Sequence, residues 1–309
     1  SRLRAALSVR KTELAELLVA LAIGDVRTRE RTCATGMEAF CVVLYKLAAP
    51  VRWYDIETVF GSSSSGLSNI FLHVMSELER RHQQLLYFNR NYVGERLQEF
   101  SDAIFDAGGL LPNSFVDGTV RGICRPVSRN KRRDGRFLSQ QSVYNGHKRK
   151  HALKFQTLIT PDGMIAHIYG PFPGRNHGIK MFRCSKIAEV VRSDPRFSRF
   201  RIFGDCAYGR DDVVVSPFGG AIANMSDNEK LVNGSMCKVR VSVEWGYGQI
   251  CNYWTALDFK RQMRTGIQPV GQMYLLGALF TNCITYVRRG YTISDYFGLA
   301  PPSLRQYIS

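Results

Sequence analysis

Residues 201–209 read RIFGDCAYG and constrain the fold more than any other stretch of the chain. They begin with a β-prone run that stops at a glycine and an aspartate, Asp205. A buried strand that delivers a carboxylate at its C-terminal end places that carboxylate at the open rim of a sheet, where ligands and metal ions are usually held. A Gly-Asp pair on its own is equally typical of an Asx turn, so the other acidic residues decide between the two interpretations.

Two further acidic residues stand in similar settings. Residues 113–120 read NSFVDGTV, a strand-like run that reaches Asp117 before a glycine. Residues 239–250 read VRVSVEWGYGQI and place Glu244 inside an apolar segment, where a charge is costly unless it has a partner. Three carboxylates in such settings predict a shared cation. Carboxylate and water oxygens are the ligands that Mg²⁺ and Mn²⁺ prefer.

The charge of the chain favours a polyanionic partner. Its 309 residues include 42 Lys+Arg and 26 Asp+Glu, which gives a formal net charge of +16 at pH 7. Clustered cations gain binding free energy from phosphates through counterion release, so we expect nucleic acid rather than a membrane as the partner.

Cysteine usage and hydropathy point to an intracellular protein without a membrane span. The eight cysteines contain no CxxC pair and no tight cluster with histidine, which zinc sites and disulfide scaffolds both need. We therefore expect reduced thiols. The apolar run at 17–23 is far too short to cross a bilayer, and no signal peptide is visible.

The N-terminal third is expected to be helical. Residues 12–23 and 37–48 have apolar side chains at the spacing of one helix face. Residues 54–60 predict a short helix that ends at a glycine, and several serines then lead into a longer amphipathic helix. We place a domain boundary near residue 100.

This helix, tight turn and amphipathic helix follow each other in the order of a helix-turn-helix. On the face of the second helix opposite the apolar one, Ser68, Asn69 and His73 are candidates for DNA contact, since asparagine can bind adenine edges in the major groove. A helical hairpin that only packs against a core is the alternative interpretation.

From residue 113 the pattern changes to strands. Residues 114–120, 151–160 and 165–169 predict three strands in a meander, followed by a helix at 179–192 and a fourth strand that ends at Asp205. The last two predicted elements are a helix from residue 238 that carries Glu244, despite valines that favour strand locally, and a helix over 270–287.

Five motifs in this order resemble the DDE endonuclease domain of PIF/Harbinger transposases. They are FVDGTVRGICRP, YNGHKRKHALKFQ, the DG and PG turns, GDCAYG and VSVEWGYGQI. The resemblance covers roughly the C-terminal two thirds of the chain. It implies an α/β protein with an RNase H-like catalytic domain, a mixed sheet flanked by helices, over residues 101–309. An all-α, helix-turn-helix-like DNA-binding region would occupy residues 1–100.

The resemblance implies a metal-dependent DNA endonuclease or transposase that cuts and joins DNA. Asp117 would bridge two Mg²⁺ or Mn²⁺ ions, and Asp205 and Glu244 would each complete one coordination sphere. Such ions serve both the attacking and the leaving oxygen of an in-line displacement. The implied partners are double-stranded DNA, as transposon ends or target site, a separate DNA-binding accessory protein, and a second copy in a homodimer. The implied location is the nucleus, with shuttling to the cytoplasm left open.

A basic segment between the first two predicted strands is expected to follow the DNA backbone beside the carboxylates. Its cations include Arg132, Arg133, Lys148, Arg149 and Lys150. For each of these residues alone, a solvated basic loop is the alternative.

Other acidic residues compete as metal ligands. Asp211 and Asp212 follow Asp205 closely, but their position after the turn is typical of an exposed helix start. Asp134 and Asp162 are interpreted as turn residues. Glu229 joins Asp211 and Asp212 as a candidate if Glu244 is not the third ligand.

Two other functions stay open at this point. After the PG turn the family commonly has His-Asp, whereas this chain has His177-Gly178. A catalytically inactive, domesticated, sequence-specific DNA-binding protein derived from a transposase is therefore one alternative. A glycosidase would also place two carboxylates in a cleft, but a charge of +16 suits DNA better than an uncharged sugar.

Overall fold

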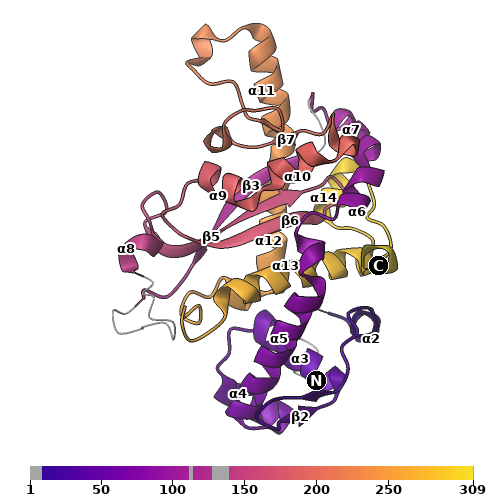
Figure 1. Cartoon of the computed structure of the whole chain (residues 1–309), viewed down its shortest axis with the longest axis vertical. Coiled ribbons are helices and arrows are strands. Elements are labelled where there is room, and N and C mark those ends of the chain that lie inside the picture. The colour runs from indigo at the N-terminus through magenta and orange to yellow at the C-terminus, as the bar shows by residue number, and fades with distance from the viewer. Residues whose placement is uncertain (1–8, 111–113, 127–138, 309) are drawn as a thin grey trace.

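A six-stranded mixed sheet flanked by helices lies at the centre of the protein (Figure 1). Strand β3 (Ser114–Gly122) runs antiparallel to β5 (Lys150–Ile159), and β5 runs antiparallel to β6 (Ile165–Pro173). These are the three strands of the predicted meander, and the expected mixed α/β class is confirmed. The structure is a computed structural model that describes residues 9–110, 114–126 and 139–308.

On its other side β3 pairs in parallel with β7 (Ile202–Phe203), and β7 pairs in parallel with β8 (Val214–Val215). Strand β4 (Tyr144–Asn145) pairs with the beginning of β5. The sequence did not predict β4 or β8, because each spans only two residues and carries no periodicity. The parallel pairing at β7 makes the sheet mixed.

Helices cover both faces of the sheet (Figure 1). On one face, α9 (Gly178–Ser185) contacts β5 and β6, and α10 (Ile187–Ser193) packs beside α9. On the other face, α12 (Ser242–Tyr253) contacts β3, and α13 (Val270–Arg288) contacts β6. Each layer buries an apolar cluster of its own against the sheet.

Two predicted helices differ from those observed. The single helix expected over 179–192 is broken at Lys186, whose backbone is left-handed with φ 56°. The helix expected from residue 238 is preceded by α11 (Asp227–Arg240), which meets α12 at Val241. A capping box between Ser226 and Glu229 begins α11, and this local signal explains the earlier start.

The N-terminal region is mostly helical, but the all-α region expected there is wrong, because β1 (Val26–Arg27) and β2 (Cys33–Ala34) form a short antiparallel pair. A glycine turn joins two of its helices, because Gly61 has φ 65° and ψ 20° and closes the shorter helix. Ser63 then caps the longer helix by accepting a hydrogen bond from the Gly66 N–H. A DNA-binding role for this pair stays a prediction. The helices and the small hairpin of this region are α2 (Lys11–Ala20), β1 (Val26–Arg27), β2 (Cys33–Ala34), α3 (Gly36–Ala48), α4 (Trp53–Phe60) and α5 (Ser64–Leu86).

The N-terminal helices share one core with the rest of the chain. Phe40 of α3 contacts Phe280 of α13 edge to face, with ring centroids 5.8 Å apart. Glu13 of α2 accepts hydrogen bonds of 2.9 Å from Arg288 at the end of α13. The division into residues 1–100 and 101–309 stays a prediction. The remaining helices are α6 (Arg90–Glu95), α7 (Leu97–Asp106), α8 (Gln140–Val143), α14 (Thr292–Phe297) and α15 (Leu304–Ile308).

All eight cysteines are free thiols, as expected from their spacing. Within the described ranges, no helix is both long and apolar enough to traverse a lipid bilayer.

Asp162, interpreted from the sequence as a turn residue, also ties three parts of the fold together. It lies in the β5–β6 turn with a fully buried side chain. Its carboxylate accepts hydrogen bonds from Thr160, Tyr92 and Arg96. Arg96 in turn donates to the Ala300 carbonyl, 2.9 Å away. The sequence shows only an aspartate before a glycine and gives no sign of these partners.

Replacing Asp162 with alanine is expected to lower the free energy of unfolding by about 3 kcal/mol, because the largely buried Arg96 guanidinium loses its only buried carboxylate partner among the described residues. Urea denaturation followed by circular dichroism measures the change. The control is Glu99→Ala, which removes the exposed partner of the same arginine and should change the stability by less than about 1 kcal/mol. Equal effects of the two changes would show that the buried network does not stabilise the fold.

Candidate active site

Two of the three predicted carboxylates lie near each other, one within β3 and one just after β7. β3 and β7 run in parallel, and Phe115 pairs with Phe203. Two residues further along both strands, the same register brings Asp117 level with Asp205. β7 has ended by then, whereas β3 continues along β5, so the two residues lie where the sheet opens on one side. Asp117 thus lies inside a strand and not at its end, because the glycine after it does not interrupt pairing with β5.

Both aspartates also bind nearby backbone. Asp117 Oδ1 accepts a hydrogen bond of 2.7 Å from the Gly118 N–H. Asp205 Oδ1 accepts one of 2.9 Å from the Ala207 N–H and caps a short 3₁₀ turn. Asp205 therefore opens a turn directly after β7, and its role as a metal ligand stays a prediction. The second oxygen of each carboxylate has no such backbone donor among the described residues.

The third carboxylate comes from the helix that covers this part of the sheet. α12 is held against β3 by Tyr247, whose hydroxyl donates a hydrogen bond of 2.7 Å to the Asp117 carbonyl oxygen. Glu244 lies one turn earlier on α12 and is exposed. Another turn earlier, Arg240 Nη1 lies 3.7 Å from Asp117 Oδ2. The spacing 240, 244, 247 places these three side chains on one face of the nearly continuous α11–α12 helix.

All of these groups influence the pKa of Asp117. Burial raises the pKa of Asp117, the Gly118 N–H and Arg240 oppose that rise, and the charges of Asp205 and Glu244 add to it. The three predicted carboxylates are thus close enough to interact electrostatically. A partly buried carboxylate with two other carboxylates nearby is typical of a site that binds a cation. In this structure the Arg240 guanidinium is the cation next to Asp117.

Carboxylate oxygens are suitable ligands for a hard divalent ion, but the three carboxylates are not placed close enough together to coordinate one ion. In the part of the chain that the structure describes, no three His, Cys, Asp or Glu side chains gather closely enough to hold a metal ion. Arg240 lies beside Asp117 instead. Glu244 is exposed, so its side chain can rotate towards the aspartates without disturbing the core.

Sequence reasoning missed the residues that surround the carboxylates. Arg240 and Tyr247 carry a signal, since they lie at helical spacing from Glu244. Lys154 was not missed, because it belongs to the basic segment that was expected beside the carboxylates; it donates a 2.7 Å hydrogen bond to the Asn176 carbonyl and interacts electrostatically with Asp205.

Tyr208 of the GDCAYG motif lies beneath both aspartates. Its hydroxyl is buried and has no hydrogen-bond partner among the described residues. Burial and the charges of Asp117 and Asp205 raise the pKa of Tyr208 well above its usual value. Its ring lies 3.5 Å from the point that a Cβ at Gly178 would occupy. The position that differs from the resembled family therefore packs against the residue beneath the carboxylates.

The competing acidic residues have other partners. Asp211 and Asp212 both bind Arg192, and Asp211 Oδ1 also accepts 2.7 Å hydrogen bonds from the two backbone N–H groups that lead into β8. The exposed helix start expected there is wrong, because the chain bends directly into a strand. Glu229 is engaged in the capping box of α11. Asp134 lies outside the described residues.

The candidates for DNA contact lie in two places. Ser68, Asn69 and His73 are half-buried on α5. Lys148 and Arg149 are exposed in the turn between β4 and β5, and Lys150 begins β5. Asn145 shapes this turn by accepting a 2.7 Å hydrogen bond from the Lys148 N–H. Arg132 and Arg133 lie outside the described residues.

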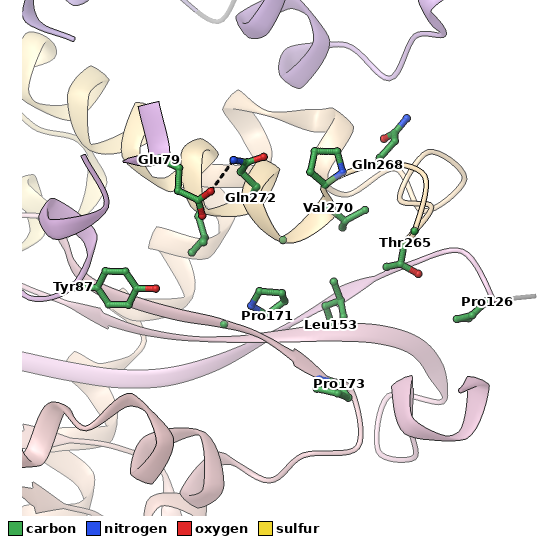
Figure 2. A pocket seen from close by; sticks show the side chains of 15 residues that line it. Glu79, Tyr87, Pro126, Leu153, Pro171, Pro173, Thr265, Gln268, Val270 and Gln272 are labelled. Carbon is green, nitrogen blue, oxygen red and sulfur yellow. Dashed lines mark hydrogen bonds between the residues drawn. The ribbon is translucent and has the colours of Figure 1, made fainter. Parts of the chain in front are cut away.

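A cavity of about 420 Å³ lies elsewhere, between α5, β6 and the beginning of α13 (Figure 2). Four prolines and Tyr87 contribute to its wall, and Gln272 donates a 2.7 Å hydrogen bond to Glu79 at its edge. None of the three predicted carboxylates lines it. The cavity is therefore separate from the carboxylate site.

Comparison with known proteins yields one match. The sequence model of the family described as DDE superfamily endonuclease matches residues 116–282, more than half of the chain. Asp117, Asp205 and Glu244 all fall inside the matched segment. No curated protein and no solved structure matches the chain.

Proposed function

The chain belongs to the DDE superfamily endonucleases, and we propose that it cleaves duplex DNA by phosphoryl transfer at Asp117, Asp205 and Glu244. The observation that carries the proposal is the parallel register of β3 and β7, which brings two acidic residues together across the sheet. Glu244, on α12, is close enough to Asp117 to raise its pKa electrostatically. Family membership implies DNA as the substrate.

The three carboxylates are proposed to hold Mg²⁺ or Mn²⁺, as a pair of ions. Bound there, the ions would activate the attacking oxygen and stabilise the leaving one. The residues around the carboxylates would hold them in position. Tyr247 fixes α12 on the backbone of Asp117, so that Glu244 is held above β3. Without metal, Arg240 offsets part of the repulsion among the carboxylates.

The turn between β4 and β5 is proposed to bind the DNA backbone. Lys148 and Arg149 project from it into solvent. Lys150 begins β5, and Thr157, which pairs with Asp117, lies near the other end of that strand. The turn and the carboxylates are therefore on the order of 20 Å apart. A duplex that crosses the carboxylates would reach this turn after about six phosphates of one strand.

Finer assignments belong to the same proposal. The motif order supports the PIF/Harbinger subtype, and α4 with α5 supports a helix-turn-helix role in site choice. A separate accessory protein and a nuclear location follow from that subtype. A catalytically inactive DNA-binding protein is the second candidate. It is favoured by Gly178, by Arg240 beside Asp117, and by the lack of a closed ligand group among the described residues.

The deciding experiment is nicking of a supercoiled plasmid in Mg²⁺, Mn²⁺ or EDTA. Nicking that needs a divalent ion supports the enzyme. Tight DNA binding without nicking in any metal supports the inactive protein.

Arg240→Gln is expected to raise the affinity for Mn²⁺ about ten-fold, because the removed cation lies within ion-pair distance of Asp117 and repels an incoming one. Calorimetric titration of Mn²⁺ in the absence of DNA measures this without any activity. The control, Lys238→Gln, removes a cation from the same helix that forms no ion pair with the described carboxylates. Equal Mn²⁺ affinities for wild type and Arg240→Gln would contradict competition between Arg240 and the metal.

A further inference from the structure

Helix α11 stands out from the body of the protein at the end opposite the N-terminal helices (Figure 1). The chain reaches it after Asp205 and returns to the site through α12, which carries Glu244. Only two of its side chains, Met236 and Val239, are buried, and both lie in its last turns. Most of α11 is therefore surface.

One stripe of exposed residues on α11 is complementary to itself when a second α11 lies against it in the opposite direction. Asp227, Leu231, Gly234 and Lys238 follow each other at the spacing of one helix face, and all four are exposed. Leu231 is 63% exposed, which is high for a leucine on a helix. A Cβ added at Gly234 would meet nothing within 4 Å, so this position is an open notch. Along the helix the stripe therefore carries an acidic residue, an apolar residue, a glycine without a side chain, and a basic residue.

We infer that α11 binds α11 of a second copy of this chain, in antiparallel orientation about a two-fold axis. When the helices are aligned so that Asp227 of one copy faces Lys238 of the other, Leu231 of one faces Gly234 of the other. Each of these pairs then occurs twice, as two-fold symmetry requires. The leucine enters the space left by the glycine, which allows the helices to approach closely.

The neighbouring charges allow this arrangement. Asp227 already binds Lys230 over 3.3 Å, but the Asp227 side chain is fully exposed and can serve both cations. Glu229 is held in the capping box with Ser226. Lys238 forms no ion pair with any residue of the described part. Ile222, 74% exposed just before α11, adds apolar surface next to the stripe.

The contact is small. A helix of 14 residues is about 21 Å long, so the pair buries less than a standard interface of roughly 1,600 Å². We expect a dissociation constant in the micromolar range, on the order of 10 µM. This inference does not depend on catalysis, and it would give the predicted homodimer a defined surface.

Sedimentation velocity of the full chain over a range of concentrations tests the inference. Wild type should pass from monomer to dimer. Asp227→Lys and Lys238→Asp should each weaken the dimer at least about ten-fold, because like charges then face each other twice. An equimolar mixture of these two variants should restore dimers, since the lysine introduced in one copy then faces the aspartate introduced in the other. Loss of folding cannot produce that recovery.

The control is Glu16→Lys, which makes the same change of net charge as Asp227→Lys on an exposed site of α2 and should leave the dimer unchanged. Monomeric wild type at about 100 µM, ten times the expected constant, would overturn the inference. So would a dimer that survives both single variants, or a mixture of the two that stays monomeric.

Discussion

Asp117→Asn, Asp205→Asn and Glu244→Gln are each expected to abolish nicking of supercoiled DNA while leaving DNA binding in place. The amide keeps the size and most of the hydrogen bonding of each side chain but removes the charge that a divalent ion needs. Rates should fall by a factor of at least about 10³. Plasmid nicking in Mg²⁺ and Mn²⁺, run beside electrophoretic mobility shifts, separates the loss of chemistry from the loss of binding.

Two further measurements distinguish a shared site from three independent ones. Double variants should be hardly slower than single ones, because residues that act through the same ions are not additive. Normal nicking by Glu244→Gln would mean that the third ligand lies elsewhere. Asp211, Asp212 and Glu229 would then have to leave the partners that they bind in this structure.

Asp117→Asn is also expected to stabilise the metal-free protein above about pH 4. Burial and the neighbouring carboxylates raise the pKa of Asp117 in the fold, so its contribution to stability is fully present below its ordinary pKa. That contribution is lost as the pH rises through the folded pKa. The asparagine does not ionise and avoids the loss. Thermal melts in EDTA at pH 3 and pH 7 should therefore show a gain only at the higher pH.

The sequence predicts the carboxylate site because its signals are local. A β-prone run before Gly204 and Asp205, and a similar run around Asp117, are typical of strands that bring acids to a sheet. The pairing that brings them together is not local. β3 and β7 are far apart in the chain, and no residue pattern specifies their parallel register. The family resemblance supplied that step.

The surroundings of the site depend on tertiary contacts and were missed for that reason. Arg240 lies beside Asp117 only because α12 packs against β3. The Tyr208 hydroxyl is buried beneath the aspartates because three glycines, at 118, 178 and 204, leave room for its side chain. Each glycine on its own suggests a turn, and only the structure shows that all three face Tyr208.

One helix was predicted correctly against its local propensity, and one helix break was missed. Valines near Glu244 favour a strand, but Val239 and Val243 are both fully buried on one side of the α11–α12 helix. Their four-residue spacing is helical, and burial decides over propensity. The helix break at Lys186 could not be predicted, because no glycine or proline stands at that position. Its left-handed backbone separates α9 from α10.

DNA affinity is expected to fall steeply with salt, because the predicted contacts are with phosphates. A protein with six or more phosphate contacts loses on the order of 10³ in affinity between about 50 and 200 mM salt. Changing Lys148, Arg149 and Lys150 together to glutamine should lower the slope of log affinity against log salt by about 2 to 3. Fluorescence anisotropy with a labelled duplex, repeated over a salt series, measures both slopes.

The matched control is the triple change of Arg199, Arg289 and Arg305 to glutamine. These arginines are exposed, and the variant loses the same net charge from other surfaces. If the β4–β5 turn binds the backbone, only the first triple variant should flatten the slope, since counterion release depends on cations at the phosphates and not on total charge. Equal effects of the two triples would mean that the attraction is spread over the whole surface. A flat plot for wild type would exclude duplex DNA as the partner.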